Sequence, residues 1–119
     1  MYTIQLKEKN IPIHWGLWAQ REYCRRKDIK TVTDYAAILS NPDTVLDAIP
    51  DMILLAAEYA AKKQGQPFSY TEMDVCEWID EMGGYSEGSK VFDVFKYIVG
   101  GGIELTENPL PEGEKKTTV

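Results

Sequence analysis

Apolar and polar residues alternate at the start of the chain and then recur at helical spacing. The segments "YTIQL" and "IPI" alternate, with the polar "KEKN" between them, so residues 2–13 are predicted to form a short β-hairpin. Pro12 has no amide hydrogen for a strand ladder, which places the second strand at a sheet edge.

Residues 14–27 show the first helical pattern. Trp15, Trp18, Ala19 and Tyr23 fall on one broad face, and basic residues close the segment, where the helix dipole favours cations. We expect Ile29, just beyond this helix, to fold back onto the core.

Two helices are predicted in the middle of the chain. Thr33 is expected to cap a short one, "DYAAILS", which ends at "NP". The second starts at Pro42 or Asp43 and ends at residue 63 or 64, where Gly65 stops it.

Pro50 interrupts this longer pattern. Proline removes one intrahelical hydrogen bond and clashes with the preceding turn, so we expect a kink or a break into two helices there. The part that follows, "MILLAAEYAAKK", is apolar almost all round, which predicts that it is the most buried helix.

The segment "PFSYTEMDVCEWIDE" predicts a helix over residues 72–82. Thr71, followed three positions later by Asp74, resembles a capping box. At about 100° per residue, Cys76 lies at the border of the core face. That core face is predicted to comprise Val75, Trp78, Ile79 and Met82.

A last helix is predicted over residues 87–99. Its apolar face is expected to comprise Val91, Phe92, Val94, Phe95, Ile98 and Val99, while Lys90, Asp93, Lys96 and Tyr97 point away. Residues 100–119 are rich in glycine and proline and poor in apolar residues, so they are predicted to form a flexible tail.

The fold class that follows from these patterns is mainly α. A chain of 119 residues fits about one domain. We expect a single helical domain of about five helices over residues 1–99, with the hairpin at 2–13 and the helices at 14–99. No segment reaches the ~20 apolar residues of a membrane span, and no secretory signal is evident. A cytoplasmic location is therefore predicted.

Charge is spread unevenly along the chain. The net charge is −6, yet residues 1–30 carry seven Lys/Arg against three Asp/Glu, and residues 31–119 carry six against sixteen. Nucleic-acid binding draws on clustered cations, so this acidic balance argues against a nucleic-acid partner and favours a protein partner.

Residues that carry chemistry are few. Cys24 and Cys76 stand too far apart for any C-x-x-C arrangement, and both are expected to be reduced and buried. The single histidine, His14, fits a local stacking or hydrogen-bonding role better than a ligand role. We therefore expect no metal, no cofactor and no enzymatic activity.

Four carboxylates of the helix over residues 72–82 form an acidic strip away from its core face, namely Asp74, Glu77, Asp80 and Glu81. Glu77 and Glu81 are four positions apart, but an acid/base pair needs carboxylates in different, partly desolvated environments. The loop spacing of a calcium site is absent. The acidic strip is expected to be a solvated or docking surface.

The order of these elements resembles the small tail assembly chaperones of long-tailed bacteriophages and prophages. The likeness covers about residues 2–98 and consists of hydrophobic patterns in two parts. The residues that carry it are Trp18-Ala19, Tyr23 and Ile29 in the first part and Gly65, Phe68, Thr71, Asp74, Val75 and Trp78-Ile79-Asp80 in the second.

This resemblance implies a non-enzymatic role in the cytoplasm of a bacterial host. Such chaperones coat the hydrophobic tape measure protein before tail assembly, keep it soluble and help to recruit tail tube subunits. The resemblance therefore implies the tape measure protein as a partner, with the tail tube protein as a second one. Self-association would suit a long client.

Exposed apolar residues rimmed by charge would serve helix-in-groove recognition of such a client. Leu17, Cys24 and Tyr97 leave the main core faces and are the candidates for that surface. An alternative is a small acidic regulatory or host-inhibitory protein, in which the acidic strip mimics nucleic acid and occupies a basic host site.

Overall fold

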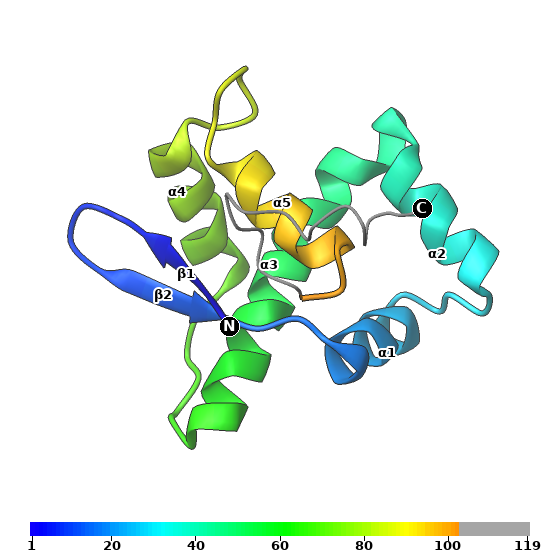
Figure 1. The fold of residues 1–119 in the computed structure, drawn as a ribbon, viewed down its shortest axis with the longest axis horizontal. Helices are drawn as coiled ribbons and strands as arrows, with labels where there is room; N and C mark the ends of the chain where they lie inside the picture. The colour runs from blue at the N-terminus through cyan, green and yellow to red at the C-terminus, as the bar shows by residue number, and fades with distance from the viewer. Residues whose placement is uncertain (103–119) are drawn as a thin grey trace, which may run out of the picture.

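The computed structural model describes residues 1–102, which form a two-stranded hairpin and five helices (Figure 1). The elements are β1 (Tyr2–Gln5), β2 (Asn10–Ile13), α1 (Leu17–Arg26), α2 (Val32–Ser40), α3 (Pro42–Gln64), α4 (Glu72–Met82) and α5 (Val91–Val99). The mainly α prediction is confirmed. Within residues 1–102 no helix is long and apolar enough to cross a membrane. The predicted flexible tail lies outside the described residues from position 103 onward.

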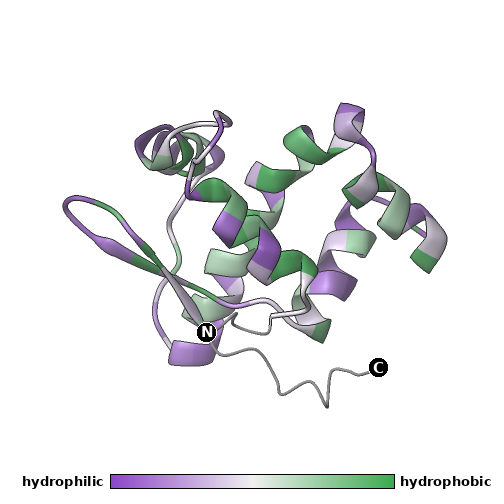
Figure 2. Cartoon of the chain, turned by 45° about the horizontal axis from the view of Figure 1, so that its top comes forward, coloured by the Kyte–Doolittle hydropathy of each residue, from purple (hydrophilic) through white to green (hydrophobic). Residues whose placement is uncertain are grey.

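The hairpin is antiparallel, with Ile4 opposite Ile11 and Thr3 opposite Pro12. Ile4, Ile11 and Ile13 are buried, so the alternation puts one face of the hairpin into the core. The turn between the strands is hydrophilic, as Figure 2 shows.

Helix α3 is the centre of the fold. It packs against β2, α1, α2, α4 and α5 (Figure 1). Its buried residues are Ala48, Ile49, Met52, Ile53, Leu55, Ala56, Ala57 and Ala60, which confirms that this is the most buried helix. The predicted break into two helices at Pro50 does not occur, because α3 runs unbroken from Pro42 to Gln64.

Several helix starts differ from the predictions because a tertiary or capping bond decides them. Helix α1 starts at Leu17, since the His14 amide donates to the Ala56 carbonyl at 3.0 Å instead of entering the helix. Thr31, not Thr33, caps α2 by accepting the Asp34 amide at 3.0 Å.

Helix α5 also starts later than predicted, at Val91 instead of residue 87. The Ser89 hydroxyl, which is buried, donates to the Met82 carbonyl at 3.2 Å and accepts the Val91 amide at 3.2 Å. These bonds hold the preceding residues in a turn that connects the end of α4 to the start of α5.

Helix α4 forms as predicted. Thr71 and Asp74 make a reciprocal capping box, and Val75, Trp78, Ile79 and Met82 are buried. Gly83 ends the helix in a left-handed conformation with φ 117°.

The predicted orientation of Tyr97 is wrong. Its side chain is 1% exposed, its hydroxyl accepts the Trp15 amide at 3.2 Å, and its ring lies 5.3 Å from that of Tyr2. Position 97 is three residues after Val94, so the two share a face of α5. Val99, predicted to be in that face, is 44% exposed.

Candidate partner-binding surface

A groove with a volume of about 340 Å³ lies between α1 and α2. We call it the α1–α2 groove; its lining residues are Gln20, Arg21, Cys24, Arg25, Ile29, Lys30, Thr31, Val32 and Tyr35. Cys24, Ile29 and Tyr35 are half-buried, whereas Val32 is 78% exposed. The groove therefore has a partly apolar lining that is open to solvent and lies among charged side chains.

The turn after α1 makes this groove. Asp28 adopts a left-handed conformation with φ 57°, which aspartate tolerates better than most residues. The Ile29 amide then donates to the Cys24 carbonyl at 2.8 Å, so the chain folds back across the end of α1 before α2 begins. The prediction that Ile29 returns to the core is confirmed.

A second hollow of about 270 Å³ lies beside the first, lined by Leu17, Trp18, Arg21 and Arg25. Arg21 and Arg25 line both hollows, so they form a ridge between them. Leu17 is 70% exposed, and the Trp18 ring lies 4.9 Å from that of Tyr59. The structure thus places Leu17 and Cys24 around one ridge, while Tyr97 is buried and contributes nothing to this surface.

The rim of these hollows is basic although the protein is acidic. Arg21 and Lys62 form no ion pair with any residue between 1 and 102, and the Lys62 amine lies 5.9 Å from the centre of the Trp18 ring. Arg25 pairs with Glu22, and Lys30 pairs with Asp28 at 2.7 Å. The surface therefore favours carboxylates on whatever binds it.

Helix α1 is fixed to the centre of the fold on its opposite side. The Arg26 guanidinium donates two bonds of 3.2 Å to Glu58 of α3, and the Lys27 amine lies 2.6 Å from Asp51. A rigid helix holds the exposed side chains in place, which reduces the entropy lost when a partner binds.

The two cysteines differ from the prediction that both are buried. Cys24 is half-buried and Cys76 is exposed. Cys76 follows Val75 on α4 and lies just outside the packed face of that helix. Burial raises the pKa of the Cys24 thiol, so at neutral pH this group is a protonated packing group, not a nucleophile.

The acidic strip is divided by its contacts. Asp74 accepts the Thr71 amide at 2.8 Å, and Glu81 accepts the Lys7 amide of the hairpin turn. Glu77 and Asp80 are exposed and form no ion pair in the part of the chain that the structure describes. Two of the four carboxylates therefore hold the fold together, and two face solvent.

His14 lies in an aromatic cluster that the sequence pattern did not reveal. Its ring is 4.8 Å from that of Tyr59, and its buried Nδ1 has no hydrogen-bond partner among residues 1–102. Burial lowers the pKa of His14, and the positive charge of Lys63 lowers it further, so the ring is neutral near pH 7. Within the same residues, no group of three His, Cys, Asp or Glu side chains is placed to hold a metal ion.

Comparison of the chain with protein-family models, with curated proteins and with solved structures finds no match in any of the three. The surface around α1 and the resemblance in hydrophobic pattern are therefore the features that bear on function.

Proposed function

We propose that the protein is a non-enzymatic assembly chaperone of the phage tail type, which binds apolar helical segments of a tape measure protein. The observation that supports this proposal best is the exposed apolar surface around α1. Leu17 and Val32, 70% and 78% exposed, lie at the two hollows on either side of the Arg21–Arg25 ridge. An amphipathic client helix would place its apolar side chains in these hollows.

The basic rim narrows the chemistry of the client. Arg21 and Lys62 have no carboxylate partner among residues 1–102, so acidic residues beside the apolar stripe of a client helix would pair with them. Interactions at such an exposed rim favour association and weaken as salt increases. A small open surface of this kind suits a chaperone that must release its client.

Co-expression with the tape measure protein of the same gene cluster tests the proposal. The variant Leu17→Glu/Val32→Glu is expected to lose co-purification of the client, with binding weakened about tenfold or more. Met73→Glu is the matched control, since Met73 is 71% exposed and lies on α4. All three positions are in the first turn of a helix, where the dipole tolerates glutamate equally. Equal effects of the two variants, or no co-purification with the unmodified protein, would count against the proposal.

The alternative, an acidic protein that mimics nucleic acid, draws on the exposed carboxylates of α4. Among the four residues of the acidic strip, only Glu77 and Asp80 have side chains that form no hydrogen bond or ion pair with the described part of the chain. Two isolated carboxylates reproduce little of a phosphate backbone, so this geometry favours the alternative less than the chaperone.

A further inference from the structure

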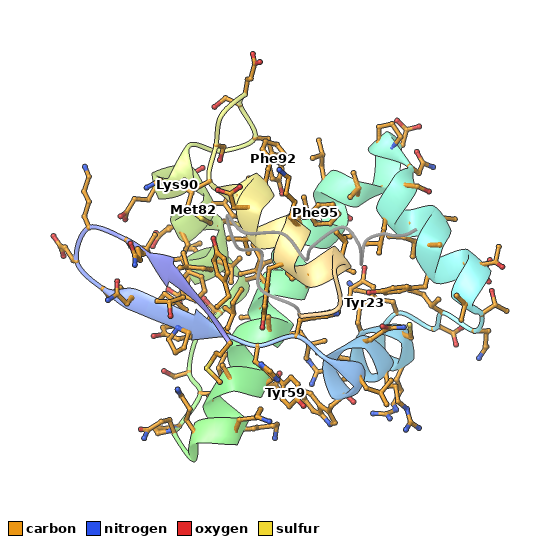
Figure 3. All side chains as sticks on the ribbon, in the orientation of Figure 1. Tyr23, Tyr59, Met82, Lys90, Phe92 and Phe95 are labelled. Carbon is orange, nitrogen blue, oxygen red and sulfur yellow. The ribbon has the colours of Figure 1, made fainter. Side chains whose placement is uncertain are left out.

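Another hollow lies along strand β1, on a different face from the α1–α2 groove. It has a volume of about 450 Å³, and its lining residues are Met1, Tyr2, Thr3, Ile4, Gln5, Met82, Lys90 and Val94. One wall is therefore the strand itself, and the other is built from the end of α4 and the start of α5. Figure 3 shows Met82 and Lys90 close to the end of β1.

The bond pattern of the hairpin shows which backbone groups of β1 face this hollow. The Leu6 amide donates to the Lys9 carbonyl at 2.9 Å, so this pair is hydrogen-bonded. Hydrogen-bonded and non-hydrogen-bonded pairs alternate along an antiparallel ladder. Thr3 and Gln5 therefore belong to non-hydrogen-bonded pairs, and their N–H and C=O groups point away from β2.

Pro12 supports this assignment independently. It lies opposite Thr3 and has no N–H. In a non-hydrogen-bonded pair the ladder needs no N–H from this residue, so proline fits the position. Strand β1 pairs only with β2 among the described residues, so its outer edge carries two residues with open donors and acceptors.

The opposite wall adds side-chain chemistry to this edge. Met82 and Val94 are 8% and 1% exposed and give the hollow an apolar base. Lys90 is exposed and forms no ion pair with the residues described, so its ammonium is available to a carboxylate.

We propose that the outer edge of β1 binds an extended segment of a partner protein as an added strand, with an apolar side chain over Met82 and Val94 and a carboxylate at Lys90. The open groups of Thr3 and Gln5 are two residues apart, which is the spacing at which a second strand presents its own donors and acceptors. A helix would leave them unpaired, because its interior amides and carbonyls are already bonded.

The test uses an acetylated and amidated octapeptide of alternating valine and threonine with one central glutamate, titrated into the full-length protein and followed by amide chemical shifts. The Thr3 and Gln5 amides are expected to shift more than that of Ile4, which belongs to a pair bonded to β2. A counterpart peptide N-methylated at every amide keeps the side chains but cannot donate, and it is expected to bind about tenfold more weakly. A lysine in place of the glutamate should also weaken binding, and Lys90→Gln should remove that preference.

Thr3→Pro removes one outward amide without touching the ladder to β2, as Pro12 already does from the opposite strand. It is expected to reduce peptide binding about fivefold, whereas Thr3→Val leaves it unchanged. Equal binding of the two peptides, or equal shifts at Ile4 and Thr3, would overturn the proposal even if Thr3→Pro fails to fold. A dimer that Thr3→Pro dissociates would overturn it as well, because a second copy would then occupy the edge.

Discussion

The hydroxyl of Tyr85 donates a hydrogen bond of 2.7 Å to the carbonyl of Leu46. In an α-helix that carbonyl accepts the amide four residues later, at position 50, where the chain has a proline without an amide hydrogen. Tyr85 thus supplies from the α4–α5 connection the donor that Pro50 lacks. This bond stabilises α3 as one helix across Pro50.

Removal of the Tyr85 hydroxyl is therefore expected to destabilise the fold. Tyr85→Phe should lower the free energy of unfolding by about 1 kcal/mol, measured by urea denaturation. Tyr70→Phe is the matched control, since the Tyr70 ring packs 4.8 Å from Trp78 while its hydroxyl has no hydrogen-bond partner among the described residues. Equal losses in the two variants would show that the Leu46 bond is not important.

A double-mutant cycle tests the role assigned to Pro50. Pro50→Ala restores the amide, so in that background Tyr85→Phe is expected to cost clearly less than in the unmodified protein. If the cost is the same in both backgrounds, Tyr85 does not compensate for the proline.

The thiols provide a probe of the α1–α2 groove. Cys76 is exposed, whereas Cys24 is half-buried with a raised thiol pKa. The variant Cys76→Ser keeps only Cys24, and the variant Cys24→Ser keeps only Cys76. Alkylation near pH 8 should therefore be several-fold slower for Cys24 than for Cys76, and alkylation of Cys24 should accelerate as the pH rises. A bound client should slow Cys24 further and leave Cys76 unchanged; protection of both thiols would contradict the assigned surface.

Tyr23 makes stability dependent on alkaline pH. Its side chain is 4% exposed, and burial, followed by the charge of Asp51, raises its pKa to about 12. Because the folded pKa lies above the unfolded value of about 10, the stabilisation is complete below pH 10 and is lost as the pH rises toward 12. The loss is roughly 2–3 kcal/mol when complete.

Urea denaturation from pH 8 to pH 11.5 measures this dependence. Tyr23→Phe should flatten the decline in the free energy of unfolding between pH 10 and 11.5 relative to the unmodified protein. Tyr59→Phe removes the hydroxyl of a half-buried tyrosine that packs against His14 and Trp18; it is the control and should retain the full decline. A parallel decline in Tyr23→Phe would contradict the role assigned to its phenol.

The fold was predictable from the sequence where one local pattern dominated. The alternation of residues 2–13 and the apolar faces of α3 and α4 are periodic over several turns or pairs, so their burial follows from spacing alone. Tyr97 was misplaced because it lies at the border of its helical face. Its hydroxyl accepts the amide of Trp15 inside the core, and no periodicity reveals a partner 82 positions away.

The candidate surface was predictable only in part for the same reason. Leu17 and Cys24 lie at positions that their own helix leaves uncovered, and a helical projection is enough to find them. Val32 and Lys62 join them through the fold of α2 and α3 around α1, which depends on the left-handed Asp28 and the packing of Trp18.

The basic rim gives the last prediction, which separates the two proposed functions. Arg21→Glu/Lys62→Glu reverses two cations that lack ion-pair partners in residues 1–102, so it should weaken client binding about tenfold at low salt and remove most of its salt dependence. Glu77→Lys/Asp80→Lys makes an equal and opposite change of charge on α4, far from the α1–α2 groove in sequence, and should leave client binding unchanged. Isothermal titration calorimetry with the client segment at two salt concentrations measures the affinity of each variant and its salt dependence. If the α4 variant abolishes activity while the α1 variant does not, the acidic alternative is the better description, because the protein then acts through its carboxylates.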